Sequence, residues 1–412
     1  KDPEMYAWVD SLITKHRRYQ EGEWMALSRY WAKAYLELAK KARISQDSML
    51  VSYLDSAMRW DSTYVPTYLA YADHWMGKGD WEKANQWIKQ AEELAPNFAP
   101  VDLARAKWYE KQLDKKEIFE ETAIRAISEA YQKATDKEKD RRLSAEINQA
   151  QRIFYMDYSL WQDAIETAEA YLLDPPTFST YLRDEKDETV AFLAYLKGQM
   201  GYGQKSVNTL KELVIRKPQN YRYQLMYAET LLLSGQFERA YEQLKGVQDL
   251  LMASGSNNPG ITQMLIQAKI GMGDPVAAKA MLQAPEFSAQ RRRGNKMRWV
   301  EIHLMLKDTA QAHKILSDLK IPQKPYQAAI YHFHAGSLEK LKGNITEAVA
   351  AYQACLKENP YHFRGRLALI ELYKEIEKVE EAQSLAMEGT LLPALPGPDY
   401  LDLLENWERS GE

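Results

Sequence analysis

The feature of this sequence that most constrains its fold is a pattern of small, aromatic and glycine residues that returns at a constant interval. Glycines stand at positions 201 and 235, alanines stand at positions 348 and 382, and the separation is the same in both pairs. A period of this length, about 34 residues, has room for two short helices and a turn, and a unit of that size cannot bury its own apolar face. The pattern therefore predicts an array of small helical units, each packed against its neighbours.

The clearest copy of the pattern runs from Val65 to Phe98. Its first half follows the i, i+3, i+4, i+7 spacing of one helix face with Tyr68, Tyr71, Ala72 and Trp75. Gly79 then permits a tight turn, because glycine has no Cβ to clash at positive φ. The second half places Ala84, Ile88 and Ala91 on another helix, which Pro96 ends. Since Ala72 and Ala84 are small, we expect the two helices to cross closely there.

Further copies keep the same order of small, aromatic and glycine residues. They lie around residues 194–218, 227–244, 336–360 and 370–386, with weaker copies around Gly273 and Val300. In its spacing and its period, the pattern resembles the tetratricopeptide repeat. The resemblance extends over roughly residues 22–392. It implies an all-α fold of about ten tandem helix-turn-helix pairs, some of them divergent, wound into a right-handed superhelix, or α-solenoid.

The two ends of the chain depart from the repeat. Residues 1–21 are predicted to form an N-terminal extension or capping helix, and residues 393–412 a C-terminal capping helix. Caps are expected because the terminal repeats of a solenoid would otherwise expose an apolar face. Docking to a partner is the alternative role of the leading helix.

Composition argues against several classes of function. The net charge is -4, from 54 Lys and Arg against 58 Asp and Glu, so we expect no nucleic-acid partner. No stretch approaches about 18 uninterrupted apolar residues, so no transmembrane segment is predicted, while membership of a membrane-associated complex stays open. Cys355 is the single cysteine and occupies the repeat position of Ala91. This predicts a buried structural residue rather than a nucleophile.

No motif in the sequence selects a catalytic or metal site. The seven histidines lack the i, i+4 zinc-ligand spacing, and no Gly-rich phosphate loop is present, so we predict no enzyme activity, no metal and no cofactor. The segment Arg291–Arg298 holds four arginines and Lys296. We favour a solvated loop between repeats there over an anion site. The irregular segment Asp174–Glu188 is also predicted to be a polar loop.

The resemblance also implies where a partner binds. In tetratricopeptide arrays the first helix of each pair lines the concave face, and fixed positions of that helix face the groove. Carried over to this chain, those positions are Leu69, Asp73, Met76, Tyr195, Arg222, Leu225, Glu229, Leu232, Phe333, Lys340, Arg364, Leu367, Glu371 and Lys374. Their mixture of apolar and charged groups suits a peptide. For any one of them, a solvated surface role is the alternative.

These features together predict a non-catalytic scaffold or adaptor that binds peptides or helices of other proteins on its concave surface. The alternative is a periplasmic or lipoprotein component of a bacterial envelope machine for polysaccharide export, pilus assembly or secretion, which the irregular repeats and abundant aromatic residues favour. The chain begins at Lys1, so we expect a mature or partial chain that would not show a leader. The compartment stays open between the cytoplasm and the bacterial periplasm or envelope.

Overall fold

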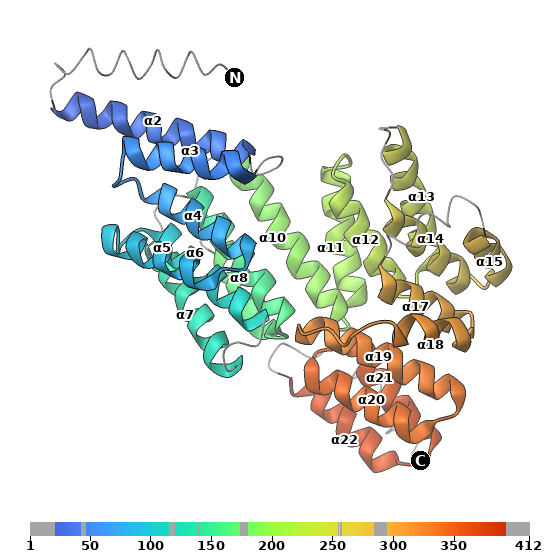
Figure 1. Cartoon of the computed structure of the whole chain (residues 1–412). Coiled ribbons are helices and arrows are strands. Elements are labelled where there is room, and N and C mark those ends of the chain that lie inside the picture. Colours follow the sequence, from blue (N-terminus) through green and yellow to red (C-terminus); the bar gives the residue numbers. More distant parts are fainter. Residues whose placement is uncertain are drawn as a thin grey trace. The chain divides into compact units, whose positions relative to one another are not determined.

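A computed structural model describes residues 21–42, 47–114, 120–137, 141–173, 180–253, 255, 258–283 and 295–392. These residues form α-helices joined by short connections, with no strand among them (Figure 1). The helices are α2 (Glu21–Ala42), α3 (Asp47–Trp60), α4 (Val65–Lys78), α5 (Trp81–Leu94), α6 (Ala99–Asp114), α7 (Glu120–Lys137), α8 (Arg141–Asp157), α9 (Trp161–Leu173), α10 (Thr180–Gln199), α11 (Gly203–Arg216), α12 (Tyr221–Leu233), α13 (Phe237–Ala253), α14 (Pro259–Gly271), α15 (Pro275–Gln283), α17 (Lys296–Met305), α18 (Thr309–Ser317), α19 (Pro325–Lys342), α20 (Ile345–Glu358), α21 (Phe363–Glu375) and α22 (Val379–Thr390). None of the described helices has the length and apolar content that crossing a bilayer requires. The segments predicted as caps, 1–21 and 393–412, lie outside the described residues except for Glu21.

The chain divides into two compact units, residues 1–147 and 148–412, and the division falls inside α8. In the first unit α2 packs on α3, α4 on α5 and α6 on α7. In the second unit the pairs are α10 with α11, α12 with α13, α14 with α15, α17 with α18, α19 with α20 and α21 with α22. The predicted all-α fold of tandem helix pairs is therefore confirmed.

Within the second unit, the first helices of successive pairs form one layer. Helix α10 contacts α12, α12 contacts α14, α14 contacts α17, and α17 contacts α19, as the green to orange helices of Figure 1 show. Small residues permit the close packing inside each pair. Ala72 and Ala84, predicted at a helix crossing in the first unit, are fully buried, and Ala228 and Ala240 repeat the arrangement in the second. Larger side chains at these positions would overpack the interface.

A residue in the left-handed conformation marks the turn inside most helix pairs. In five turns it is glycine, at 79, 201, 235, 273 and 343, with φ from 69° to 98°. In three others it is Ser159, Lys307 or Glu377, with φ of 58°, 56° and 60°. Residues 273 and 307 are separated by the same number of positions as the glycines at 201 and 235, and so are residues 343 and 377. The turn geometry therefore recurs even where the glycine does not.

The start of the second unit packs against a segment near its end. The Trp161 ring, at the start of α9, is stacked with the Tyr361 ring at a centroid distance of 6.0 Å. Lys324 Nζ lies 2.5 Å from Asp157 Oδ2, which joins residues 167 positions apart. Gly201 faces the Phe363 ring so closely that an added Cβ would lie 2.8 Å from it. These contacts place the α8–α9 connection and the α10–α11 turn beside the starts of α19 and α21.

One predicted loop is largely helix. The sequence predicts a polar loop over Asp174–Glu188, but α10 begins at Thr180 and includes the charged end of that segment. Asp187 is buried, and each of its carboxylate oxygens lies 3.1 Å from a basic group, one of Arg216 and one of Lys217. The prediction was wrong because charges expected in solvent are neutralised by the neighbouring helix.

Candidate functional site

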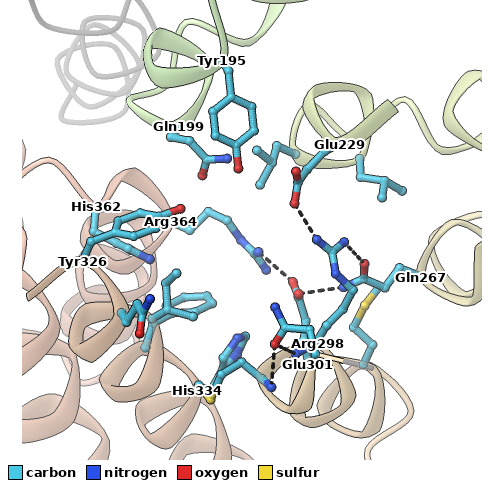
Figure 2. A pocket seen from close by; sticks show the side chains of 18 of the residues that line it. Tyr195, Gln199, Glu229, Gln267, Arg298, Glu301, Tyr326, His334, His362 and Arg364 are labelled. Carbon is cyan, nitrogen blue, oxygen red and sulfur yellow. Dashed lines mark hydrogen bonds and ion pairs between the residues drawn. The ribbon is translucent and has the colours of Figure 1, made fainter. Parts of the chain in front are cut away.

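The interior of the second unit holds a cavity of about 710 Å³. It is lined by the first helices of six consecutive pairs, α10, α12, α14, α17, α19 and α21 (Figure 2). This volume lies in the range of sites that enclose a ligand. A smaller cavity of about 250 Å³ shares Gln199, Tyr326, His362 and Arg364 with it. We call the larger space the inner cavity.

One position of the repeat supplies four of the lining residues. Tyr195, Glu229, Gln267 and Glu301 each stand six residues before the left-handed residue of their turn. Because successive first helices lie side by side, equivalent positions face the same interior. Figure 2 shows these four side chains directed toward one another from α10, α12, α14 and α17.

The charged groups of the inner cavity are joined in one network. Arg298 donates from Nη2 to Glu229 Oε1 and from Nη1 to Gln267 Oε1, the latter at 2.9 Å. Gln267 Nε2 donates to Glu301 Oε2 at 2.6 Å, and Arg364 Nη1 donates to Glu301 Oε1 at 2.7 Å. The two cations and two anions therefore balance, and the network ties together α12, α14, α17 and α21 (Figure 2).

The surroundings of the ionisable groups in the inner cavity keep their pKa values far from 7. Burial opposes the charge on Glu301, but the Arg364 guanidinium, His334 and Arg298 outweigh it and lower the pKa to about 2. Burial lowers the pKa of His334 to about 4 and that of His362 to about 3, where nearby Arg364 adds to the effect. Both imidazoles are therefore neutral at pH 7.

The tyrosines of the inner cavity also stay uncharged. Burial, together with the negative charge of Glu229, raises the pKa of Tyr326 to about 12 and the pKa of Tyr195 well above its usual range. For Arg298, burial works against the charge, yet Glu229 and Glu301 raise its pKa. Apart from two matched ion pairs, the polar lining is thus made of neutral groups.

Five of the fourteen residues predicted to face the groove line the inner cavity: Tyr195, Glu229, Leu232, Phe333 and Arg364. Of these, Phe333 is also part of the core of α19–α22, with its ring under the Arg364 guanidinium at 4.8 Å.

The other nine predicted residues lie elsewhere. In the first unit, Leu69 packs on the core, and Asp73 and Met76 are half-buried. In the second unit, Leu225 packs on a core cluster and Leu367 is half-buried. Of the four charged residues, Lys340 is half-buried and pairs with Glu375 at 2.8 Å. Arg222 is exposed and lies 3.9 Å from Glu188, and Glu371 and Lys374 are exposed.

Sequence reasoning missed most of the network. Gln267, Arg298, Glu301, His334 and His362 were not predicted as site residues, although each lines the inner cavity. Counting back six residues from each turn would have found Gln267 and Glu301. No comparable signal marks the two histidines.

Arg298 corrects the interpretation of the basic segment Arg291–Arg298. The sequence favours a solvated loop there, but Arg298 belongs to α17 and its side chain is held inside the inner cavity by Glu229. The prediction was wrong for Arg298 because an acidic residue 69 positions away neutralises it. Arg291, Arg292 and Arg293 lie outside the described residues.

Cys355 is fully buried in the core of α19–α22, where burial raises the pKa of its thiol to about 12. It is therefore a poor nucleophile. Among the described residues, no group of three or more His, Cys, Asp or Glu side chains is placed to hold a metal ion.

Comparison with known proteins shows no match to a family model and none to a curated protein sequence. Among solved structures, the chain is similar to yeast Tom70, with 14% identity, a TM-score of 0.38 and coverage of 93% of this chain and 96% of that one. It is also similar to the TPR domain of P58(IPK), with 14% identity, a TM-score of 0.22 and coverage of 85% and 99%.

The class of protein follows from the chain's own geometry. Its described helices form tandem antiparallel pairs with left-handed turns, small residues at the crossings and first helices in a common layer. This is an all-α protein built of tandem helix-turn-helix repeats.

Proposed function

We propose that this protein is a non-catalytic scaffold that binds a segment of a partner protein in the inner cavity of its second unit. The observation that carries the proposal is the inner cavity itself, which six first helices line with apolar and polar side chains. Repeat arrays of this kind gather equivalent positions of successive helices into a continuous binding surface.

The chemistry of the lining supports binding rather than catalysis. General acids and bases work best with pKa values near the ambient pH. The pKa values of Glu301, His334 and His362, at about 2, 4 and 3, lie well below neutrality. The described lining contains no Ser, Thr, Cys or Lys to serve as a nucleophile. These groups are arranged to hold a molecule in place.

Site-specific photocrosslinking tests the proposal. A photoreactive phenylalanine derivative replaces Gln199, which lines the inner cavity, or Gln383, which is exposed on α22, the second helix of its pair. In an extract of the source cells, we expect the probe at Gln199 to crosslink to a defined protein, and the crosslinked peptide to come from one segment of it.

The probe at Gln383 controls for surface contacts. Equal crosslinking of the same protein from both positions would place the partner on the outer face and contradict the proposal. Crosslinking from Gln199 to small molecules alone would contradict it as well. Circular dichroism of both variants checks that the helices remain intact.

A further inference from the structure

The inner cavity contains ionised groups that already neutralise one another, and this limits what it accepts. We propose that its occupant is an extended peptide segment that carries no charged side chain into the cavity. This inference rests on the proposed function and specifies the chemistry of the partner.

The charges that line the inner cavity are already paired with one another. Glu229 and Glu301 are each hydrogen-bonded to an arginine, and Gln267 bridges the two pairs. An acidic side chain entering beside Arg364 would also meet the Glu301 carboxylate, whose oxygen lies 2.7 Å from that guanidinium. A basic side chain would meet Arg298 or Arg364 in the same way. A buried charge without its own counter-ion is costly, so the cavity favours an uncharged occupant.

The inner cavity is also lined by neutral polar groups, among them two histidines. His334 is 4% exposed, lines the inner cavity and makes no hydrogen bond to a described residue. His362 Nδ1 accepts a hydrogen bond from the Gly365 amide at 2.9 Å, which leaves the proton of the neutral ring on Nε2. Both rings share the lining with Gln199 and Tyr195 (Figure 2). The Tyr195 hydroxyl is already hydrogen-bonded to Tyr326, whereas the buried His334 ring needs a partner that a ligand filling the cavity can supply.

The lining of the inner cavity also favours one backbone conformation of its occupant. A helix satisfies its backbone groups internally and presents an apolar stripe to a groove. An extended segment offers a free N–H and C=O at each residue, which suits amide, hydroxyl and imidazole side chains. Between these polar groups, Leu232, Leu233 and Ile330 line apolar parts of the inner cavity that can receive uncharged side chains. The mixed lining therefore matches an extended segment better than a helix.

Selection from a phage-displayed library of random peptides tests this inference on the full chain. Peptides of about twelve residues are long enough for three helical turns, so the library offers both conformations. We expect the enriched sequences to share a central run of uncharged residues without i, i+3, i+4 apolar spacing. The affinity of synthetic copies, measured by fluorescence anisotropy, should change less than about twofold between low salt and about 0.5 M NaCl, since screening acts on charges.

Variants then locate the binding. We expect Gln199→Ala and Tyr195→Phe each to weaken binding about fivefold, the effect of one lost hydrogen bond. Gln383→Ala, on the exposed face of α22, should leave the affinity unchanged. The double variant Arg364→Gln, Glu301→Gln removes a matched ion pair and should leave the affinity for the uncharged selected peptides nearly unchanged.

The outcomes separate this inference from the proposed function. Enriched peptides that are acidic or basic, that lose affinity steeply with salt and that fail on the double variant would overturn the inference and leave peptide binding standing. Helical, amphipathic peptides would overturn it in the same way. Peptides that bind Gln199→Ala and Tyr195→Phe with wild-type affinity would remove the inner cavity as the site. Failure of the folded protein to enrich any peptide would overturn both.

Discussion

At the scale of single residues, His334 and His362 couple the inner cavity to pH. Burial, with Arg364 nearby, lowers their pKa values to about 4 and 3, below the ordinary histidine value of 6.5. The unfolded chain takes up protons on these rings as the pH falls through 6.5, whereas the folded protein does so only near pH 4 and below. Stability from the two histidines is therefore complete above pH 6.5 and is lost as the pH falls toward 4.

We predict that His334→Gln makes stability less dependent on pH. The free energy of unfolding is measured with urea at pH 7 and at about pH 4.5. We expect its decrease between these two pH values to be smaller in the variant than in the wild type, by roughly 2–3 kcal/mol. His313→Gln, on the exposed face of α18, should retain the wild-type dependence. If the free energy of unfolding of His334→Gln depends on pH as that of the wild type does, the His334 ring is protonated in the folded protein at about pH 4.5. Glu301, with its pKa near 2, loses its own contribution only between pH 4.5 and 2.

At the scale of the elements, Lys307 and Glu377 occupy turn positions that glycine holds elsewhere. Their φ values of 56° and 60° are left-handed, and both side chains are exposed. In this conformation the strain of a residue that has a Cβ is about 1–2 kcal/mol. Glycine relieves that strain but loses more backbone entropy on folding, so replacement by glycine gives a net stabilisation smaller than the strain itself. The hairpins form nevertheless, because the helices on each side bury their apolar faces.

We predict that Lys307→Gly and Glu377→Gly each stabilise the protein by about 0.5–1 kcal/mol in urea unfolding. Lys307→Ala should have little effect, because alanine keeps the Cβ that causes the strain. Lys211→Gly, at an exposed position inside α11, should instead destabilise by about 1 kcal/mol. A destabilising Lys307→Gly would mean that the lysine side chain, and not the backbone, holds this turn.

At the scale of the whole second unit, the contact between Gly201 and Phe363 joins the α10–α11 turn to the start of α21. Gly235 has the same left-handed backbone, but an added Cβ there meets nothing within 4 Å. The two glycines therefore form a matched pair. A substitution at Gly235 tests the backbone conformation alone. A substitution at Gly201 also tests the packing against Phe363.

We predict that Gly235→Ala costs about 1–2 kcal/mol through its positive φ. Gly201→Ala should cost a further 1–3 kcal/mol or so, because its Cβ would overlap the Phe363 ring and force that contact apart. Urea unfolding of the two variants measures the difference. Affinity for the peptides selected above should fall in Gly201→Ala but not in Gly343→Ala, because Gly343 is a left-handed turn residue that does not line the inner cavity and has nothing within 4 Å of an added Cβ. Equal costs in the two variants would show that the Phe363 contact contributes nothing to stability.

The local features of this fold are predictable from the sequence for a physical reason. Helix faces, turn glycines and crossing alanines follow from interactions within one repeat or between neighbouring repeats, so a periodic pattern reports them. The same rule identified Tyr195 and Glu229 as inward-facing residues. It missed Gln267 and Glu301, which occupy the same position, because the copy around Gly273 is weak and Lys307 replaces the turn glycine of the next.

By itself, then, the sequence determined the class of fold and the order of the helix pairs, and its repeat pattern placed Tyr195 and Glu229 at a position that lines the inner cavity. Only the tertiary structure decided that the first helices of the second unit form a cavity and that the charges lining it cancel. The reason is distance along the chain. Arg298 meets Glu229 across 69 positions and Lys324 meets Asp157 across 167. A short sequence repeat does not encode such pairings, because they depend on how the stacked pairs curve together.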